Sequence, residues 1–372
     1  MEKNNTILDY IAWRGDLSFS ASPFCDVDAL IFAQLSYLDF SKIVGADFEN
    51  GKTLKDVCEA FCNSADFNER KHLGLVINPL SVDLLLEAGK SARFGGVTLS
   101  GFDFRYNKDA EEQFCALTFS FLDCHFVAFR GTDDTIVGWK EDFNLAFCEK
   151  VQAQADSAEY ISRALDFFDG SFRIGGHSKG GNLAIFAASS VSDFDFSRIR
   201  AVYNFDGPGF PKETLSRPAF LKIQPLVHTV YPQFSVVGQL FSHFDEYTVT
   251  KSTGSLLLQH DPFTWLVKGA RFDEKQHLDE GSERFSRAFN GWLSKIDGEK
   301  RELFVEATFT ILKATKSGSL TEIHADSFRA SALMVRAMTK LDDETRSAVL
   351  EIAGNFIKEA GRAFSENANQ TQ

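Results

Sequence analysis

The stretch between residues 172 and 188 carries the pattern in this sequence that is best suited to chemistry. A short apolar run leads into residues 176–180, Gly-His-Ser-Lys-Gly, and an apolar run of helical character follows at once. A serine in a sharp turn between a strand and a helix has strained backbone angles, so the positions two before and two after it must be very small. Gly176 and Gly180 meet this requirement. The stretch predicts a nucleophile elbow at Ser178, with the dipole of the following helix directed at the site; the alternative is an ordinary glycine-rich turn.

A polar turn upstream of the elbow could complement a serine nucleophile. An apolar stretch runs directly into residues 130–132, Arg-Gly-Thr. Acyl transfer requires donors where the oxyanion of the tetrahedral intermediate forms, and an early loop at the top of a sheet can supply one. We expect this oxyanion hole from the backbone N–H of Thr132, with its hydroxyl as a further donor, and from the backbone N–H of Lys179. Without the downstream serine, the stretch would be an ordinary polar turn with Trp139 and Asp142 in structural roles.

These motifs carry a family resemblance. The turn at 129–132 with Trp139 and Asp142, followed by the serine elbow, resembles the class 3, fungal-type triacylglycerol lipases. A fuller set is similar to a bacterial family of lipase-like proteins of unknown function, the Mbeg-like family, over about residues 26–265. The resemblance implies an α/β-hydrolase fold with a mostly parallel central sheet, and it leaves the substrate open. The motifs of the fuller set are Gln34-Leu35-Ser36-Tyr37, Gly138-Trp139-Lys140-Glu141-Asp142-Phe143, Gly176-His177-Ser178-Lys179-Gly180-Gly181-Asn182 and Asn204-Phe205-Asp206-Gly207-Pro208-Gly209-Phe210.

A serine nucleophile needs a histidine base, which in α/β hydrolases follows the serine and the acid along the chain. A base belongs on a loop at the carboxyl end of the last strands. His260 follows a strand-like stretch and lies in such a loop, so it is our choice, with His277 in reserve. His228 lies inside a strand-like stretch, and His243 precedes a strand, so both fit the role less well.

The carboxylate that would orient this histidine is the harder assignment. In class 3 lipases the acid follows the second strand after the serine, and the matching position here is Ser235, which cannot balance an imidazolium charge. One strand earlier, the stretch 201–205 leads to Asp206 and a Gly-Pro-Gly turn, which resembles the Asp-Pro turn of pancreatic-type lipases. We therefore predict Asp206, with Asp245 and Asp261 as alternatives. A carboxylate that only caps its own turn is the structural alternative for Asp206.

The surrounding chain reads as helices, then alternating strands and helices, then a helical tail. Helical spacing or capping predicts helices over 28–38, 54–62 and 79–88, whereas a period of two predicts a hairpin of strands over 114–119 and 126–129. We expect an α/β-hydrolase domain over residues 1–280, which includes N-terminal helices within 26–92, and a C-terminal helical extension over 281–372. Within the extension, helical spacing covers 285–293, 302–309 and 349–360.

Composition limits the partners of the protein. A net charge of −13 and a pI near 5.1 argue against nucleic acid and against an anionic membrane surface as binding partners. No apolar run approaches the 18 residues or so of a transmembrane helix, and the N-terminus has no apolar signal core, so we expect a cytoplasmic protein without a transmembrane segment. The six cysteines lack the paired spacing of a disulfide framework, and Cys58 and Cys62 fit a buried helix face better than a metal site.

Taken together, these patterns predict a serine hydrolase acting on a small-molecule or lipid acyl ester. Ser178 would attack the carbonyl, His260 would transfer the proton, Asp206 would orient His260, and Thr132 with Lys179 would hold the oxyanion. No metal or organic cofactor is required. A catalytically silent hydrolase-fold protein used for binding is the alternative, and acyl transfer to an acceptor other than water is a third reading. Acyl chain length, the role of the C-terminal helices and the oligomeric state stay open.

Overall fold

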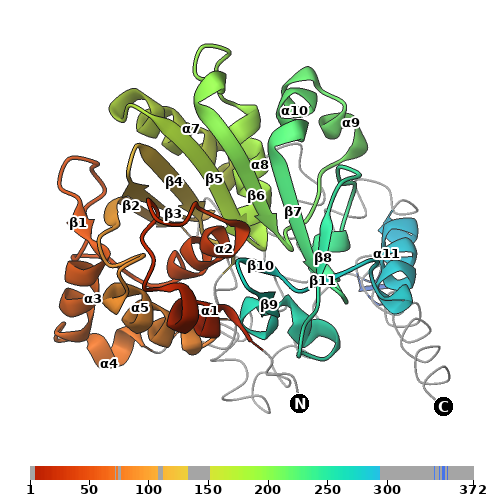
Figure 1. The fold of residues 1–372 in the computed structure, drawn as a ribbon. Helices are drawn as coiled ribbons and strands as arrows, with labels where there is room; N and C mark the ends of the chain where they lie inside the picture. Colours follow the sequence, from red (N-terminus) through yellow and green to blue (C-terminus); the bar gives the residue numbers. More distant parts are fainter. Residues whose placement is uncertain are drawn as a thin grey trace.

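The computed structural model describes residues 5–71, 73, 77–107, 112–132 and 151–293, together with positions 339, 343, 346, 347 and 350. Within these ranges the chain forms a nine-stranded sheet, with strand order β1-β2-β3-β4-β5-β6-β7-β8-β11, and a separate two-stranded ribbon of β9 and β10 (Figure 1). The strands are β1 Lys52–Thr53, β2 Thr98–Asn107, β3 Glu112–Phe121, β4 Cys124–Phe129, β5 Ser171–His177, β6 Ile199–Phe205, β7 Val227–Pro232, β8 Thr248–Thr250, β9 Val267–Lys268, β10 Arg271–Phe272 and β11 Glu274–Lys275.

The sheet is parallel in its middle and antiparallel at both sides. Strands β4 to β8 pair in parallel, whereas β1 to β4 are joined by antiparallel pairings and β11 pairs antiparallel with β8. The predicted hairpin is confirmed as β3 and β4, which are joined at Leu122 and Asp123. The expected α/β fold is confirmed, with a central parallel part that holds the elbow and antiparallel strands on both sides of it. The carboxyl ends of β4, β5, β6 and β7 meet at one edge, where an α/β fold binds its ligands.

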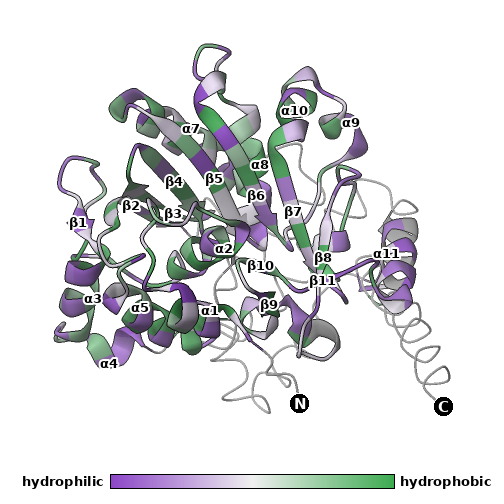
Figure 2. Cartoon of the chain, in the orientation of Figure 1, coloured by the Kyte–Doolittle hydropathy of each residue, from purple (hydrophilic) through white to green (hydrophobic). Residues whose placement is uncertain are grey.

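Helices cover both faces of this sheet (Figure 1). The helices are α1 Ile7–Arg14, α2 Asp26–Leu35, α3 Leu54–Cys62, α4 Phe67–Arg70, α5 Leu80–Lys90, α7 Gln152–Phe167, α8 Lys179–Ser189, α9 Lys212–Leu215, α10 Pro218–Ile223 and α11 Glu280–Leu293. Phe126 and Ala128 of β4 pack in one core with α1, α2, α3 and α5, whereas Val127 and Phe129 pack in the other with α7, α8 and α10. This alternation is the period of two in the sequence. Figure 2 shows hydrophobic residues along the central strands and a largely hydrophilic α11.

A buried ion pair fixes the N-terminal helices to one another. The guanidinium of Arg93 donates to both carboxylate oxygens of Asp28, at 2.8 and 2.5 Å, and both side chains are fully buried. Tyr10 donates to the same carboxylate at 2.9 Å, and Arg93 lies 4.2 Å from the ring centroid of Phe19. Removing one partner would leave a buried charge without its counter-ion, which is strongly destabilising. The pair thereby holds α2, whose C-terminal end leads to Tyr37.

The predicted helices and the observed ones differ mainly at their ends. The helix over 54–62 is confirmed as α3, and α5 begins after Pro79, with the side chain of Asn78 accepting from the N–H of Leu80. The helix predicted over 28–38 runs from Asp26 to Leu35 instead. The N–H groups of Tyr37 and Leu38 donate to carbonyls only three residues before them, at 3.2 Å, so the α-helical pattern ends there. The predicted helix at 285–293 lies within α11. The tail helix at 302–309 lies outside the described residues, as does 349–360 apart from position 350.

Candidate active site

Ser178 lies in the sharp turn between β5 and α8. Its backbone has φ 58° and ψ −133°, a left-handed conformation that a side chain other than glycine rarely adopts. A Cβ on Gly176 would lie 2.3 Å from the backbone of Gly180, and a Cβ on Gly180 would lie 2.1 Å from the carbonyl oxygen of Phe129. Both glycines are therefore required by close backbone packing. The turn raises Ser178 above the carboxyl edge of the sheet, at the N-terminus of α8.

His260 lies within hydrogen-bond distance of the hydroxyl of Ser178. It ends the short 3-10 turn η4, Leu256–His260, and its Nε2 lies 3.1 Å from Ser178 Oγ. Its Nδ1 lies 2.6 Å from Oδ2 of Asp206. Donation from Nδ1 to the carboxylate leaves Nε2 as an acceptor for the serine proton. The side chain of His260 is 29% exposed whereas that of Asp206 is fully buried, so the site opens to solvent on the histidine side.

Asp206 follows β6 in a second left-handed turn, with φ 50°. The alternative that this carboxylate only caps its own turn does not describe its contacts, because the N–H of Gly207 donates to Asn204 Oδ1 at 3.0 Å. The oxygens of Asp206 accept from His260 and Ser235 instead. The structure thus brings together Ser178, His260 and Asp206, and their catalytic roles stay predictions.

Ser235 corrects one expectation from the sequence. At the position where class 3 lipases carry the acid, its hydroxyl donates to Oδ1 of Asp206 at 2.5 Å, and its side chain is fully buried. The residue that argued against a triad therefore contributes a hydrogen bond to the carboxylate. Strands β6 and β7 are parallel neighbours, so the residues that follow them lie close together at the same edge of the sheet. Sequence reasoning set Ser235 aside because a hydroxyl cannot balance a charge, whereas in the structure it donates to Asp206.

His177 and Tyr37 also support the site, and sequence reasoning gave neither a role. His177 Nε2 lies 2.9 Å from the carbonyl oxygen of His260, and Nδ1 lies 3.0 Å from the Tyr37 hydroxyl. A carbonyl can only accept, so His177 carries its proton on Nε2, and Tyr37 donates to Nδ1. Burial lowers the pKa of His177 well below its ordinary value, and the neighbouring His260 lowers it further. His177 is therefore neutral and hydrogen-bonds the backbone of the segment that carries His260.

The predicted oxyanion donors lie on the two elements that flank Ser178. A Cβ on Gly131 would lie 3.1 Å from Ser178 Cβ, so the turn that contains buried Thr132 passes directly beside the serine. Lys179 is the first residue of α8, where a backbone N–H has no acceptor within its own helix. Its side chain extends elsewhere, because Nζ donates to the backbone and side-chain oxygens of Gln113 at 2.9 and 3.1 Å. The donor roles of Thr132 and Lys179 stay predictions, and Trp139 and Asp142 lie outside the described residues.

Comparison with known proteins places this site in a family. The model of the Mbeg1-like family matches residues 88–310, which is more than half of the chain and includes Ser178, Asp206 and His260. The chain belongs to the Mbeg1-like family. Among solved structures, the crystal structure of M37 lipase is similar at 14% identity, over 57% of this chain and 68% of that one, with a TM-score of 0.33. A search of curated proteins returned no significant match.

In this Mbeg1-like protein the alternative histidines have other surroundings. His228 is exposed on β7 and lies 3.8 Å from Asp26, and His277 is exposed. His243 is half-buried and packs against Tyr231, and desolvation of its ring lowers its pKa to about 4. None of the three contacts Ser178 among the hydrogen bonds of the described residues.

The alternative acids are also engaged elsewhere or exposed. Asp261 accepts from Asn78 Nδ2 at 2.6 Å and from the N–H of Phe263 at 3.0 Å, and Asp245 is exposed. In the ranges that the structure covers, His, Cys, Asp and Glu side chains do not gather in groups of three or more that could hold a metal ion. Among the helices of those ranges, none is long and apolar enough to cross a membrane.

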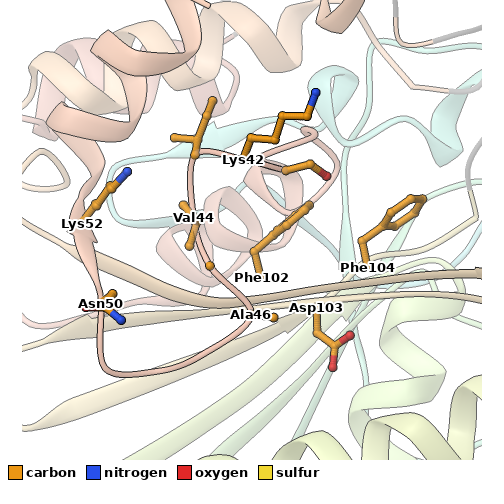
Figure 3. Close-up of a pocket in the computed structure, with 11 residues that line it drawn as sticks. Lys42, Val44, Ala46, Asn50, Lys52, Phe102, Asp103 and Phe104 are labelled. Atoms are coloured by element: carbon orange, nitrogen blue, oxygen red, sulfur yellow. The ribbon is translucent and has the colours of Figure 1, made fainter.

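A separate hollow lies beside β2, and neither Ser178, Asp206 nor His260 lines it. It has a volume of about 550 Å³ and is open to solvent (Figure 3). The side chains of Lys42 and Lys52 lie on either side of Val44 in this view. Its lining is formed by residues 41–46, Asn50, Lys52 and residues 102–104, and it includes none of the triad candidates.

Proposed function

We propose that this Mbeg1-like protein is a serine hydrolase that cleaves an acyl ester through an acyl-enzyme intermediate. The observation that carries the proposal is the continuous hydrogen-bonded line from Ser178 Oγ through His260 to Asp206, with distances of 3.1 and 2.6 Å. A buried carboxylate, a histidine with one accepting nitrogen and a serine on a strained turn are the parts that acyl transfer needs.

Each residue has one role in the proposed reaction. Ser178 Oγ attacks the ester carbonyl while His260 Nε2 takes the hydroxyl proton, and the same nitrogen returns that proton to the leaving alcohol. Asp206 holds the tautomer of His260 and stabilises the imidazolium. The backbone N–H groups of Thr132 and Lys179 stabilise the oxyanion. Water, activated by His260, then attacks the acyl-serine ester, which releases the carboxylic acid product and restores the hydroxyl of Ser178.

The substrate class stays broad in this proposal. The described site favours an acyl ester, either a small molecule or a lipid, and it does not select a chain length. The reading as a silent binding protein rested on Ser235 in the usual position of the acid. That support is lost, because Ser235 donates to a carboxylate one strand away. Transfer of the acyl group to an acceptor other than water remains the variant of this chemistry to test.

Turnover of p-nitrophenyl esters tests the proposal. Purified full-length protein and the Ser178→Ala variant are compared on esters of increasing acyl length, with release of p-nitrophenol measured in the presence and absence of an alcohol acceptor. We expect turnover by the wild-type protein alone. Equal rates for the two proteins would contradict the proposed mechanism, and a rate that rises with the alcohol would assign acyl transfer.

A further inference from the structure

The loop that follows β7 packs directly on the carboxylate of Asp206. Ser235 donates to Oδ1 at 2.5 Å while Oδ2 accepts from His260, so the two oxygens have different donors. A Cβ on Gly238, three residues later, would lie 2.2 Å from the same Oδ1. The loop therefore fixes the rotation of the carboxylate about its Cβ–Cγ bond.

The same loop is joined to the segment that carries the histidine. The N–H of Phe234 donates to Gln259 Oε1 at 2.9 Å, and Gln259 directly precedes His260. Gln259 is buried, and its carbonyl accepts from the indole of Trp265 at 2.7 Å. One loop thus contacts the acid through Ser235 and the base-bearing segment through Phe234.

Helix α11 holds this loop along its length. At the start of the helix, the hydroxyl of buried Ser282 donates to the carbonyl oxygen of Ser235. One turn later, the hydroxyl of Ser286 donates to the carbonyl of Gln239 at 3.0 Å, and Asn290 donates to that carbonyl at 3.2 Å. Figure 1 shows α11 beside the β8 and β11 edge of the sheet.

We propose that Ser235 is a positioning residue for Asp206 and that α11, through Ser282, holds Ser235 in place. This inference rests on the proposed hydrolase function and extends it, because it makes α11 part of the support of Asp206. A buried carboxylate that loses a donor is left under-solvated and free to rotate. The departure from the class 3 pattern at Ser235 then has a physical role. Its hydroxyl lies after β7, where class 3 lipases carry the acid, and it orients the carboxylate of Asp206, which follows β6.

The kinetic test uses point variants of the full chain. Removing the Ser235 hydroxyl in Ser235→Ala should lower kcat about 10- to 100-fold, as expected for a hydrogen bond to a charged group, with KM nearly unchanged. Ser235→Thr keeps the hydroxyl and should recover most of kcat. Ser282→Ala should lower kcat about 3- to 10-fold, as expected for a hydrogen bond between neutral groups. The matched control is Ser286→Ala, which removes the same group from the same helix but leaves the carbonyl of Ser235 untouched.

An unchanged kcat in a folded Ser235→Ala variant would overturn the role of Ser235, and an unchanged kcat in a folded Ser282→Ala variant would overturn the role of α11. A second readout does not need turnover. The proton between His260 Nδ1 and Asp206 should give a far-downfield proton NMR signal, which should move in Ser235→Ala and stay in Ser286→Ala. A wild-type protein with this signal but without activity would contradict the proposed function alone. A signal insensitive to Ser235→Ala would contradict the positioning role alone.

Discussion

Two neighbouring strands are each followed by a residue with a positive φ. Ser178 after β5 and Asp206 after β6 are both left-handed, with φ of 58° and 50°, and both precede tightly packed backbone. The N–H of Ser178 donates to the carbonyl of Phe205 at 2.9 Å, so the two turns are joined. Each such residue costs about 1–3 kcal/mol and persists only where its surroundings require it.

The two turns differ in what they do with the side chain. After Ser178 the chain enters α8 and the serine stays partly exposed, whereas after Asp206 it enters an irregular loop and the carboxylate is fully buried. The comparison teaches that one strained turn can leave a serine hydroxyl partly exposed while the next keeps a carboxylate in a low-dielectric environment. The predictions test this difference between the two turns.

The largest effect should come from the presented side chains. Ser178→Ala and His260→Ala should each lower kcat by about 10⁴-fold or more, because nucleophile and base act as one unit. Steady-state kinetics on p-nitrophenyl esters, with thermal unfolding as a check of the fold, measures this. Additive losses in the double variant would contradict a single catalytic unit.

The buried acid should come next. Asp206→Asn keeps the shape but removes the charge that selects the tautomer of His260, so kcat should fall by about 10³- to 10⁴-fold. Asp261→Asn and Asp245→Asn are the controls, because Asp261 is held by Asn78 and Asp245 is exposed. Full activity in Asp206→Asn with a loss in either control would transfer the role of the acid.

The packing of the turn at Ser178 can be disrupted without changing Ser178, His260 or Asp206. In Gly176→Ala the new methyl group would lie 2.3 Å from the backbone of Gly180, so the free energy of unfolding should fall by about 1–3 kcal/mol. Gly96→Ala is the control, because a Cβ there meets no atom within 4 Å. Urea unfolding followed by circular dichroism compares them. Equal stabilities would mean that the elbow does not depend on this close approach.

A pH dependence of stability is also expected, since each turn has one histidine packed beside it. His177 precedes Ser178, and His243 packs where a Cβ on Gly209 would lie 2.7 Å away from it. Burial lowers the pKa of His177 well below 6.5 and that of His243 to about 4.

The unfolded chain therefore binds more protons than the folded one below pH 6.5, and stability falls as the pH falls. For one such histidine the slope is about 1.4 kcal/mol per pH unit, in the window from about 6.5 to about 4 for His243. Urea unfolding between pH 7 and 4.5 should show a smaller slope in His243→Gln, and an unchanged slope in His277→Gln, where the histidine is exposed. An equal slope in all three proteins would contradict a His243 that stays neutral in the folded protein.

Local signals predicted the elements, and contacts across the chain decided the site. Gly176, which packs on Gly180, and the apolar spacing of α3 depend on residues a few positions away, so the motif and the periodicity located them. Asp206, by contrast, meets His260 from 54 residues away, and Tyr37 meets His177 from 140 residues away. No local pattern encodes such pairs, and only the shared sheet edge brings them together.

The same limit explains the misjudgement of Ser235. Its residue type showed that it could not be the acid, but its partner lies on another strand, so its donation to Asp206 could be seen only in three dimensions. Likewise, α7 carries a weakly apolar sequence and was not predicted, because its buried face is defined by Tyr160 and Ile161 packing on α8 and the sheet. The roles of Ser178, His260 and Asp206 in catalysis stay predictions.

Labelling with a fluorophosphonate probe tests the central claim most directly, because it reports an activated serine without knowledge of the substrate. The full-length protein and Ser178→Ala are treated in parallel, and intact mass with peptide mapping locates the adduct. We predict one label per chain on Ser178 and none on the variant. Folded wild-type protein that stays unlabelled, or a label that persists in Ser178→Ala, would contradict the activated nucleophile on which this account depends.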